Sequence, residues 1–192
     1  MIRQATSADA PILSKLIIQA MGDLAVKFVN SSDPLMAVGL FEHFAALTAN
    51  QYSYENALVW EDENGVCGMI SGYDGACLHQ LREPFHLYIA RVYRFEQILE
   101  DETQPGEYYI DCLSVLPRSQ GKGIARQLIK ALVDHAAQLG HSTVGLLVHK
   151  SNAQAKKLYT RLGFKVVDQR VFVGDVYEHL QYRIDLADNR AD

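Results

Sequence analysis

The most informative stretch of the sequence is LSVLPRSQGKGIA, residues 113–125. Its apolar start predicts a buried strand that ends at Pro117, because proline cannot donate a hydrogen bond to a sheet. A short polar turn follows, and Gly121 and Gly123 open a long amphipathic helix. Glycines there let backbone N–H groups approach a ligand closely, and the helix N-terminus adds partial positive charge. The segment therefore predicts an anion site suited to a pyrophosphate.

Two commoner phosphate-binding loops do not fit this segment. A Walker A loop has a glycine five residues before its Gly-Lys pair and Ser or Thr after the pair, but Leu116 and Gly123 stand there. The dinucleotide fingerprint needs a third glycine, and Arg126 occupies that position. From the turn alone, a glycine-rich connection without any ligand is an equal alternative.

The rest of the chain shows alternating strand and helix patterns. Thr6 and Asp9 form a capping-box pattern before an apolar helix, and Asn64-Gly65 is a strong hairpin signal. Strands are expected over residues 2–5, 57–60, 66–72, 107–116, 142–149, 164–167 and 176–184, and further helices over 35–47, 85–99, 121–139 and 152–162. These elements predict one α/β domain over residues 1–192, with a mixed sheet.

Composition indicates an ordinary globular protein. Hydrophobic residues make up 48% and charged residues 21% of the 192 positions, and no run of about 18 apolar residues predicts a membrane span. The N-terminus lacks the pattern of a signal peptide. Cys67, Cys77 and Cys112 have no CxxC spacing, which argues against a disulfide framework and a zinc site. The net charge of −5 speaks against nucleic-acid binding. We therefore expect a cytoplasmic protein without a metal, a membrane or a nucleic acid as partner.

Two motifs in the second half carry a family resemblance. Residues 118–123, RSQGKG, match the acetyl-CoA signature R/Q-x-x-G-x-G/A, and residues 152–164, NAQAKKLYTRLGF, match the pattern N-x-x-A-x-x-x-Y-x-x-x-G-F. In this order and spacing they resemble the GNAT N-acetyltransferase superfamily, closely over residues 107–168. The resemblance implies an α/β (α+β) fold with a mixed, mostly antiparallel central sheet flanked by helices. It also implies a V-shaped splay between the strands that end near Leu116 and His149.

The resemblance further implies acetyl-CoA as cosubstrate. Backbone amides of residues 120–125 would hold the pyrophosphate, and the backbones of Leu113 and Val115 would pair with the pantetheine like an added strand. Asn152 would contact the pantetheine arm. The full set of expected contacts is Leu113, Ser114, Val115, Arg118, Ser119, Gln120, Gly121, Lys122, Gly123, Ile124, Ala125, Asn152, Ala155 and Tyr159.

Acetyl transfer to an amine needs a polarised thioester carbonyl, a proton for the departing thiolate and a deprotonated amine. The phenol of Tyr159, which the resemblance implies to lie near the thioester sulfur, can donate the proton. Its alternative role is that of a core tyrosine. A strand amide near Leu113 can polarise the carbonyl.

The base is one of two carboxylates, Asp111 or Glu107. Alternate residues of a strand share a face, so Glu107, Tyr109, Asp111 and Leu113 are expected to point the same way. Glu107 could instead be a solvated residue at the start of the strand, and Asp111 a buried hydrogen-bonding anchor. Cys112 has the opposite orientation and is expected to face the core or a covering helix, which favours direct transfer in a ternary complex over an acetyl-cysteine.

The expected function is therefore acetyl-CoA-dependent N-acetylation of a primary amine of a small molecule or peptide. The alternative is a non-catalytic acetyl-CoA-binding sensor or partner module of the same fold. Acceptor recognition is assigned to the segments 21–34, 74–106 and 169–176, of which 74–106 is expected to form a helical lid. Its aromatic residues are equally compatible with satellite core or a dimer face, and the family habit allows a homodimer.

Overall fold

The central sheet runs through the whole molecule. The computed structural model describes residues 1–31 and 33–185, so residue 32 and residues 186–192 of the predicted domain lie outside the described part. In this part seven strands form one sheet in the order β1-β2-β3-β4-β5-β7-β6. The strands are β1 (Ile2–Gln4), β2 (Ala57–Asp62), β3 (Gly65–Asp74), β4 (Tyr108–Val115), β5 (Thr143–His149), β6 (Lys165–Phe172) and β7 (Asp175–Arg183).

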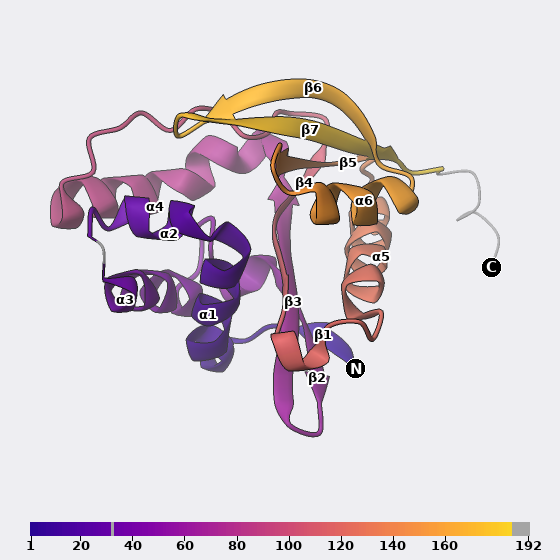
Figure 1. Cartoon of the computed structure of the whole chain (residues 1–192), viewed down its shortest axis with the longest axis horizontal. Helices are drawn as coiled ribbons and strands as arrows, with labels where there is room; N and C mark the ends of the chain where they lie inside the picture. The colour runs from indigo at the N-terminus through magenta and orange to yellow at the C-terminus, as the bar shows by residue number, and fades with distance from the viewer. Residues whose placement is uncertain (32, 186–192) are drawn as a thin grey trace.

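Helices cover both faces of the sheet (Figure 1). They are α1 (Ala10–Met21), α2 (Asp23–Phe28), α3 (Pro34–Ala46), α4 (Leu78–Tyr93), α5 (Ile124–Gln138) and α6 (Ala153–Arg161). One core cluster joins α1–α4 to one face, and a second joins α5 and α6 to the other. Among the described residues, none of these helices combines the length and apolar character needed to cross a membrane.

The first helix starts as the capping-box pattern predicts. The Thr6 amide donates to Asp9 Oδ2 at 2.8 Å, and the reciprocal contact is also present. Arg3 adds a bidentate ion pair to the same carboxylate, with nitrogen–oxygen distances of 2.7 and 2.9 Å. These contacts connect strand β1 to the N-terminus of α1.

Helix α4 begins earlier and ends earlier than the predicted helix over residues 85–99. Its buried residues are Leu78, Arg82, Phe85 and Ile89, which lie on one face at helical spacing. An arginine occupies the second of these positions, so the apolar pattern becomes visible only from Phe85 onward. The helix ends where Arg94 adopts a left-handed conformation, with φ of 57°.

Strands β4 and β5 are neighbours in the sheet but pair over a short distance. They are parallel, and only Tyr108–Ile110 is in register with Val144–Leu146. The other neighbouring strands of the described sheet are antiparallel. Beyond Ile110 the two strands diverge, which confirms the predicted V-shaped splay and the mostly antiparallel mixed sheet.

A β-bulge interrupts β4 just before the splay. Ser71 pairs with Cys112 and the next residue, Gly72, pairs with Ile110, so Asp111 is the extra residue. The alternation of side chains therefore shifts by one. Ile110 and Leu113 both pack toward the α5 side, whereas Cys112 packs into the α1–α4 cluster. The predicted common face of Glu107, Tyr109, Asp111 and Leu113 is therefore wrong for Leu113, which lies beyond the bulge.

Candidate active site

Two cavities meet at the splay between β4 and β5. The glycine-loop cavity, about 780 Å³, lies between the turn before α5 and helix α6. The Asp111 cavity, about 840 Å³, extends from the splay toward α2 and the β6–β7 hairpin. The residues that line both cavities are Gln19, Ala20, Leu113, Asn152, Ala155 and Tyr159. A molecule in one cavity can therefore contact a molecule in the other at this junction.

The glycine-loop cavity gathers most of the residues predicted to bind acetyl-CoA. They are Leu113, Ser114, Val115, Ser119, Gln120, Gly121, Gly123, Ile124, Ala125, Asn152, Ala155 and Tyr159. Gly121 and Gly123 have φ of 76° and 78°, and a Cβ added at either would meet no described atom within 4 Å. The turn thus exposes backbone amides beside the N-terminus of α5, an arrangement that fits a pyrophosphate.

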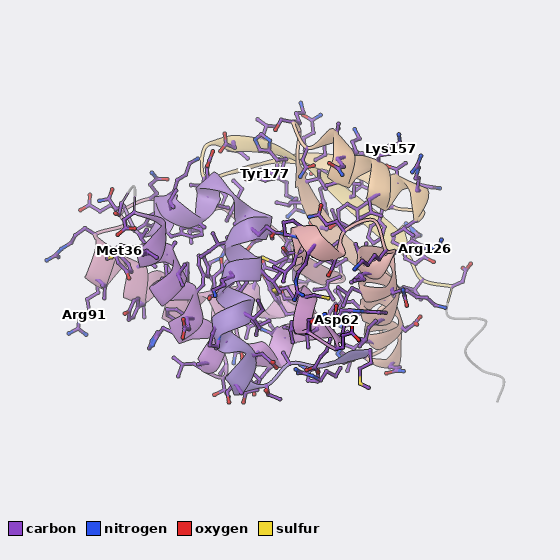
Figure 2. The ribbon with its side chains drawn as sticks, turned by 60° about the horizontal axis from the view of Figure 1, so that its bottom comes forward. Met36, Asp62, Arg91, Arg126, Lys157 and Tyr177 are labelled. Carbon is purple, nitrogen blue, oxygen red and sulfur yellow. The ribbon has the colours of Figure 1, made fainter. Side chains whose placement is uncertain are left out.

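Cations of this cavity come from positions that the sequence reading did not select. Arg126, Lys157 and Arg161 line it, and Figure 2 shows Arg126 and Lys157 on the same side of the molecule. Arg118 and Lys122 are not among its lining residues in the described part of the chain. These two lie near Asp62, whose pKa is lowered by the Asn64 amide and, more weakly, by both cations.

The main chain of β4 faces the splay at alternate residues. The Leu116 amide donates to Cys67 O at 2.8 Å on the β3 side, so the polar groups of Leu113 and Val115 point to the open side. The carbonyl of Val115 already accepts hydrogen bonds from the Gln19 and Gln120 side chains, at 2.9 and 3.0 Å. The predicted strand-like pairing of pantetheine at Val115 would compete with these two side-chain amides for the Val115 carbonyl. Leu113, by contrast, lines both cavities.

Helix α6 presents Asn152 and Tyr159 to the junction. Asn152 caps the helix by accepting a hydrogen bond from the Ala155 amide at 3.0 Å, which orients its side chain. The Tyr159 ring is buried and packs edge-on against Phe164, with ring centroids 5.6 Å apart. Burial, with a smaller effect of Cys112, raises the pKa of the Tyr159 phenol above its ordinary value. The phenol therefore stays protonated at neutral pH and is able to donate.

Asp111 projects into the cavity named after it. The residue is half-buried, and its Oδ2 atom is fully buried without a hydrogen-bond partner among the described residues. Burial raises the pKa of this carboxyl well above its ordinary value, and the nearby Glu102 raises it further, against the opposing effects of Arg82 and of a hydrogen bond with Gln51. A buried carboxyl oxygen without a partner is costly, so the site favours a proton or a cation beside it.

Glu107 lies elsewhere. Its side chain is fully buried and accepts hydrogen bonds from Thr103, His179 and Gln181 at 2.7–2.9 Å. Burial alone would raise the pKa of Glu107, but these hydrogen bonds outweigh it and hold the pKa below its ordinary value. Glu107 is not among the described residues that line either cavity. Its contacts suit an anchor that joins β4 and β7 better than the predicted base.

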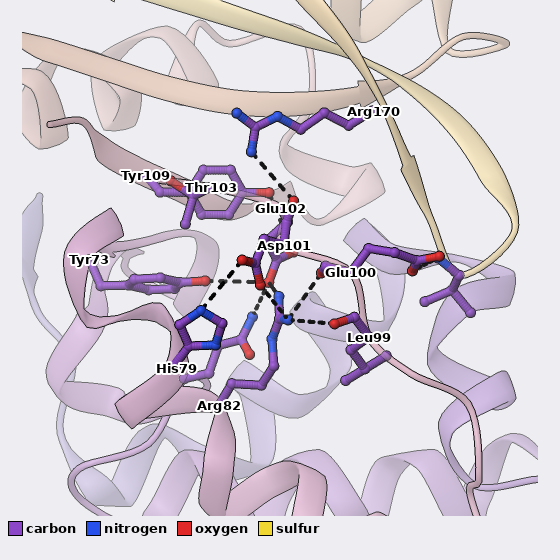
Figure 3. Close-up of polar contacts among 12 residues, drawn as sticks. Tyr73, His79, Arg82, Leu99, Glu100, Asp101, Glu102, Thr103, Tyr109 and Arg170 are labelled. Carbon is purple, nitrogen blue, oxygen red and sulfur yellow. Dashed lines mark hydrogen bonds and ion pairs between the residues drawn. The ribbon is translucent and has the colours of Figure 1, made fainter. Parts of the chain in front are cut away.

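Glu102 is a cavity residue that the sequence reading missed. It belongs to the loop between α4 and β4, is 5% exposed, and lines the Asp111 cavity. Its Oε1 atom accepts from Gln51 at 2.7 Å and from Arg82 at 2.9 Å (Figure 3). A glutamate in an irregular loop without a motif gives no signal in the sequence. Arg82 on an otherwise apolar helix face was the available clue, because a buried cation requires a partner.

The variable segments contribute to the Asp111 cavity in part. Asp23 and Lys27 of α2 line it, as do Phe172 and Asp175 near the β6–β7 turn. Helix α4, the helical part of the predicted lid, packs into the α1–α4 core cluster through fully buried residues such as Phe85. Within the described residues 74–106, only the loop that follows α4 reaches the cavity, through Glu102.

Cys112 packs into the core as expected, and it also borders the Asp111 cavity. Burial raises the pKa of its thiol well above the ordinary value, with Asp111 and Glu102 adding to the effect. A thiol in this state is a poor nucleophile. Within residues 1–31 and 33–185, no group of three or more His, Cys, Asp or Glu side chains is arranged to hold a metal ion.

Comparisons with known proteins agree with this geometry. Residues 28–164 match the model of the Acetyltransferase (GNAT) family, which is more than half of the chain. The crystal structure of an N-acetyltransferase from Staphylococcus aureus Mu50 is similar, with a TM-score of 0.81 and 26% identity over 95% of this chain and 100% of that one. The chain therefore belongs to the GNAT acetyltransferase family, and the resemblance inferred from the two motifs is confirmed.

Curated relatives match over a smaller share of their own length. A mycothiol acetyltransferase from Gordonia bronchialis is 29% identical over 172 residues, covering 85% of this chain and 50% of the relative. A spermine/spermidine N(1)-acetyltransferase from Bacillus subtilis is 30% identical over 77 residues, covering 40% of this chain and 51% of the relative. In both cases the match spans about half of the relative's length.

Proposed function

We propose that this protein transfers an acetyl group from acetyl-CoA to a primary amine of a small molecule or peptide, directly within a ternary complex. The observation that carries the proposal is the meeting of the two cavities at Leu113, Asn152 and Tyr159. One cavity suits a pyrophosphate and its pantetheine arm, and the other carries the carboxylates that an amine requires. Acetyl-CoA would supply the activated acyl group at the junction.

Each residue at the junction has a part that its position supports. The free main-chain groups of Leu113 can hydrogen-bond to the thioester region where β4 leaves β5. Tyr159, kept protonated by burial, can donate its proton to the departing sulfur. Asn152, fixed as the cap of α6, can hold the pantetheine arm. These roles follow the family resemblance, residue by residue.

We propose Asp111 as the general base. Of the two predicted carboxylates, it is the one that lines the acceptor side of the junction, two residues from Leu113 along β4. When ionised, it can take the proton that the amine loses as the new amide bond forms. Glu107 would support β4 from behind through its bonds to β7.

The names of the relatives do not select one acceptor, since one is named for mycothiol and another for spermine and spermidine. The test is therefore release of free thiol from acetyl-CoA against a panel of small amines, diamines, amino acids and peptides. An acceptor-dependent rate, with the acetylated product identified by mass spectrometry, would support the proposal. Failure to bind acetyl-CoA would overturn it.

The second candidate is a module that binds acetyl-CoA without turning it over. It predicts tight binding of acetyl-CoA by calorimetry and no acceptor-dependent thiol release across the panel. The continuity of the two cavities favours the enzyme, because a sensor needs no acceptor cavity beside the thioester.

A further inference from the structure

The deep part of the Asp111 cavity holds two carboxylate oxygens that lack good partners. Glu102 Oε2 has one long contact, 3.4 Å to the Tyr109 hydroxyl, while its Oε1 atom takes the strong hydrogen bonds from Gln51 and Arg82. Asp111 Oδ2 is buried without a partner among the described residues. Carboxylates buried in this way normally have several donors, so this part of the cavity is short of hydrogen-bond donors.

The same place is also short of positive charge. Glu102 and Asp111 together face one buried cation, Arg82, which is 2.9 Å from Glu102. At the cavity mouth, Lys27 is already paired with Asp175 at 2.9 Å, and Asp23 adds another carboxylate. His149 lies there too, 4.0 Å from Asp175. When Asp111 is ionised, one further cation in the deep part would balance the pair.

Hydrogen bonds reach the loop that carries Glu102 from both sides, as Figure 3 shows. Arg82 donates to the carbonyls of Leu99 and Glu100 at 3.2 and 3.0 Å. From the β6–β7 hairpin, Arg170 donates to Gln104 at 2.6 Å, and the Val173 amide donates to Glu100 at 2.9 Å. Glu102 is therefore placed before any acceptor arrives, which is what selective binding requires.

We propose that Glu102, together with Asp111, binds a second cationic nitrogen of the acceptor, so that diamines are preferred over monoamines of the same length. Glu102 is then a specificity-determining residue of the reaction. An ammonium group brings three N–H donors and one charge, and these match the missing donors and the missing charge. The inference rests on the proposed function and names the class of its acceptor.

The layout along β4 separates the two nitrogens. Leu113 marks the junction with the glycine-loop cavity, Asp111 lies two residues further into the Asp111 cavity, and Glu102 lies beside Asp111. Since each strand residue advances about 3.3 Å, the reacting nitrogen and the second cation are roughly 7 Å apart or more. A cation at Glu102 would also favour the ionised form of Asp111, the form that at this separation accepts the proton of the reacting nitrogen through an intervening water.

The test compares kcat/KM for matched pairs of acceptors, such as 1,5-diaminopentane against pentylamine, over chains of three to six methylene groups. We expect a diamine preference of about tenfold or more at the best length, well above the factor of about two that a second reactive nitrogen gives. Glu102→Gln should reduce the preference to about two. Glu96→Gln, exposed in the same loop and not among the described residues lining the cavity, is the matched control and should keep it.

A preference near two in the unmodified protein would overturn the inference, and so would a preference that survives Glu102→Gln. Calorimetric titration of 1,5-diaminopentane into the CoA-bound protein gives a second readout that needs neither turnover nor a variant. Diamine binding about tenfold tighter than that of pentylamine supports the inference, and equal binding overturns it. Absence of thiol release with any amine would count against the proposed function alone.

Discussion

Tyr159 is the residue on which the proposed chemistry depends most directly. Tyr159→Phe removes the phenolic proton and keeps the ring that packs on Phe164. We expect kcat to fall about 10²-fold, within the range that positioned proton donors contribute, while the Kd for acetyl-CoA changes less than about threefold. Steady-state kinetics and calorimetry separate the two effects. An unchanged kcat would leave Tyr159 as a core tyrosine only.

Asp111 should show opposite effects on activity and stability. Because its pKa is raised in the folded state, the folded protein keeps a proton that the unfolded chain loses above pH of about 4, so this contribution to stability disappears as the pH rises through the raised pKa. Asp111→Asn should lower kcat/KM about 10²-fold and increase the free energy of unfolding by about 1 kcal/mol at neutral pH.

Denaturant unfolding and pH–rate profiles check this prediction. In the unmodified protein kcat/KM should rise with pH through the raised pKa of Asp111, and the variant should lose that limb. A variant that is both inactive and less stable would instead identify Asp111 as a structural anchor.

Sequence patterns predicted the residues whose role is set by local spacing. Asn152 and Tyr159 lie at fixed positions of one helix, so their motif defines their geometry. Glu102 approaches Asp111 only through the tertiary fold, by way of a loop that Arg82 holds. Arg118 and Lys122 had the right charge beside the right turn, but neither is among the described residues that line the cavity.

At the scale of elements, Gly145 of β5 lies between β4 and β7 and directly beside the buried carboxylate of Glu107. A methyl group there would overlap the carboxylate of Glu107, which cannot move because three donors hold it. We expect Gly145→Ala to lower the free energy of unfolding by about 2 kcal/mol or more. Gly39→Ala is the control, since an added Cβ there meets no described atom within 4 Å and should stabilise α3 by about 0.5–1 kcal/mol.

Chemical denaturation of both variants measures the difference between them. Equal stability of the two would mean that β5 and Glu107 can shift apart without cost, and that Glu107 is less firmly anchored than its contacts imply.

Elements with uniform patterns were predicted within a few residues, as for α5 and its stop at Gly140. The predicted bounds of helix α4 were shifted toward the C-terminus because a charged residue, Arg82, occupies a core position in its first half. The bulge at Asp111 could not be predicted, because nothing in the residues of β4 distinguishes an extra residue from regular alternation. Its cause lies in the pairing with β3.

At the scale of the whole molecule, acetyl-CoA should stabilise both halves of the fold together. The walls of the glycine-loop cavity come from α1 as well as from α5 and α6, and these elements belong to different core clusters. At a concentration of 100 times its Kd, the ligand should add about 2.7 kcal/mol to the free energy of unfolding.

Thermal unfolding monitored by Trp60 fluorescence and by far-UV circular dichroism provides the measurement. Both probes should shift upward by the same amount in one transition. A shift in one probe without the other would show that the two core clusters unfold separately and that the ligand bridges them weakly.

The bulge divides β4 into two segments, and the alternation of side chains between the two faces of the sheet is offset by one residue from one segment to the other. What each side chain between Cys112 and Val115 faces is thus set by a count of residues as well as by their identity. Deletion of Asp111 would remove the bulge and leave Cys112 and Leu113 on their present faces. Regular one-to-one pairing of the full-length strand with β3 would instead exchange the two faces, turning Leu113 toward the α1–α4 layer and Cys112 toward α5. Anyone who transplants this strand into a related protein must therefore preserve the bulge as well as the sequence.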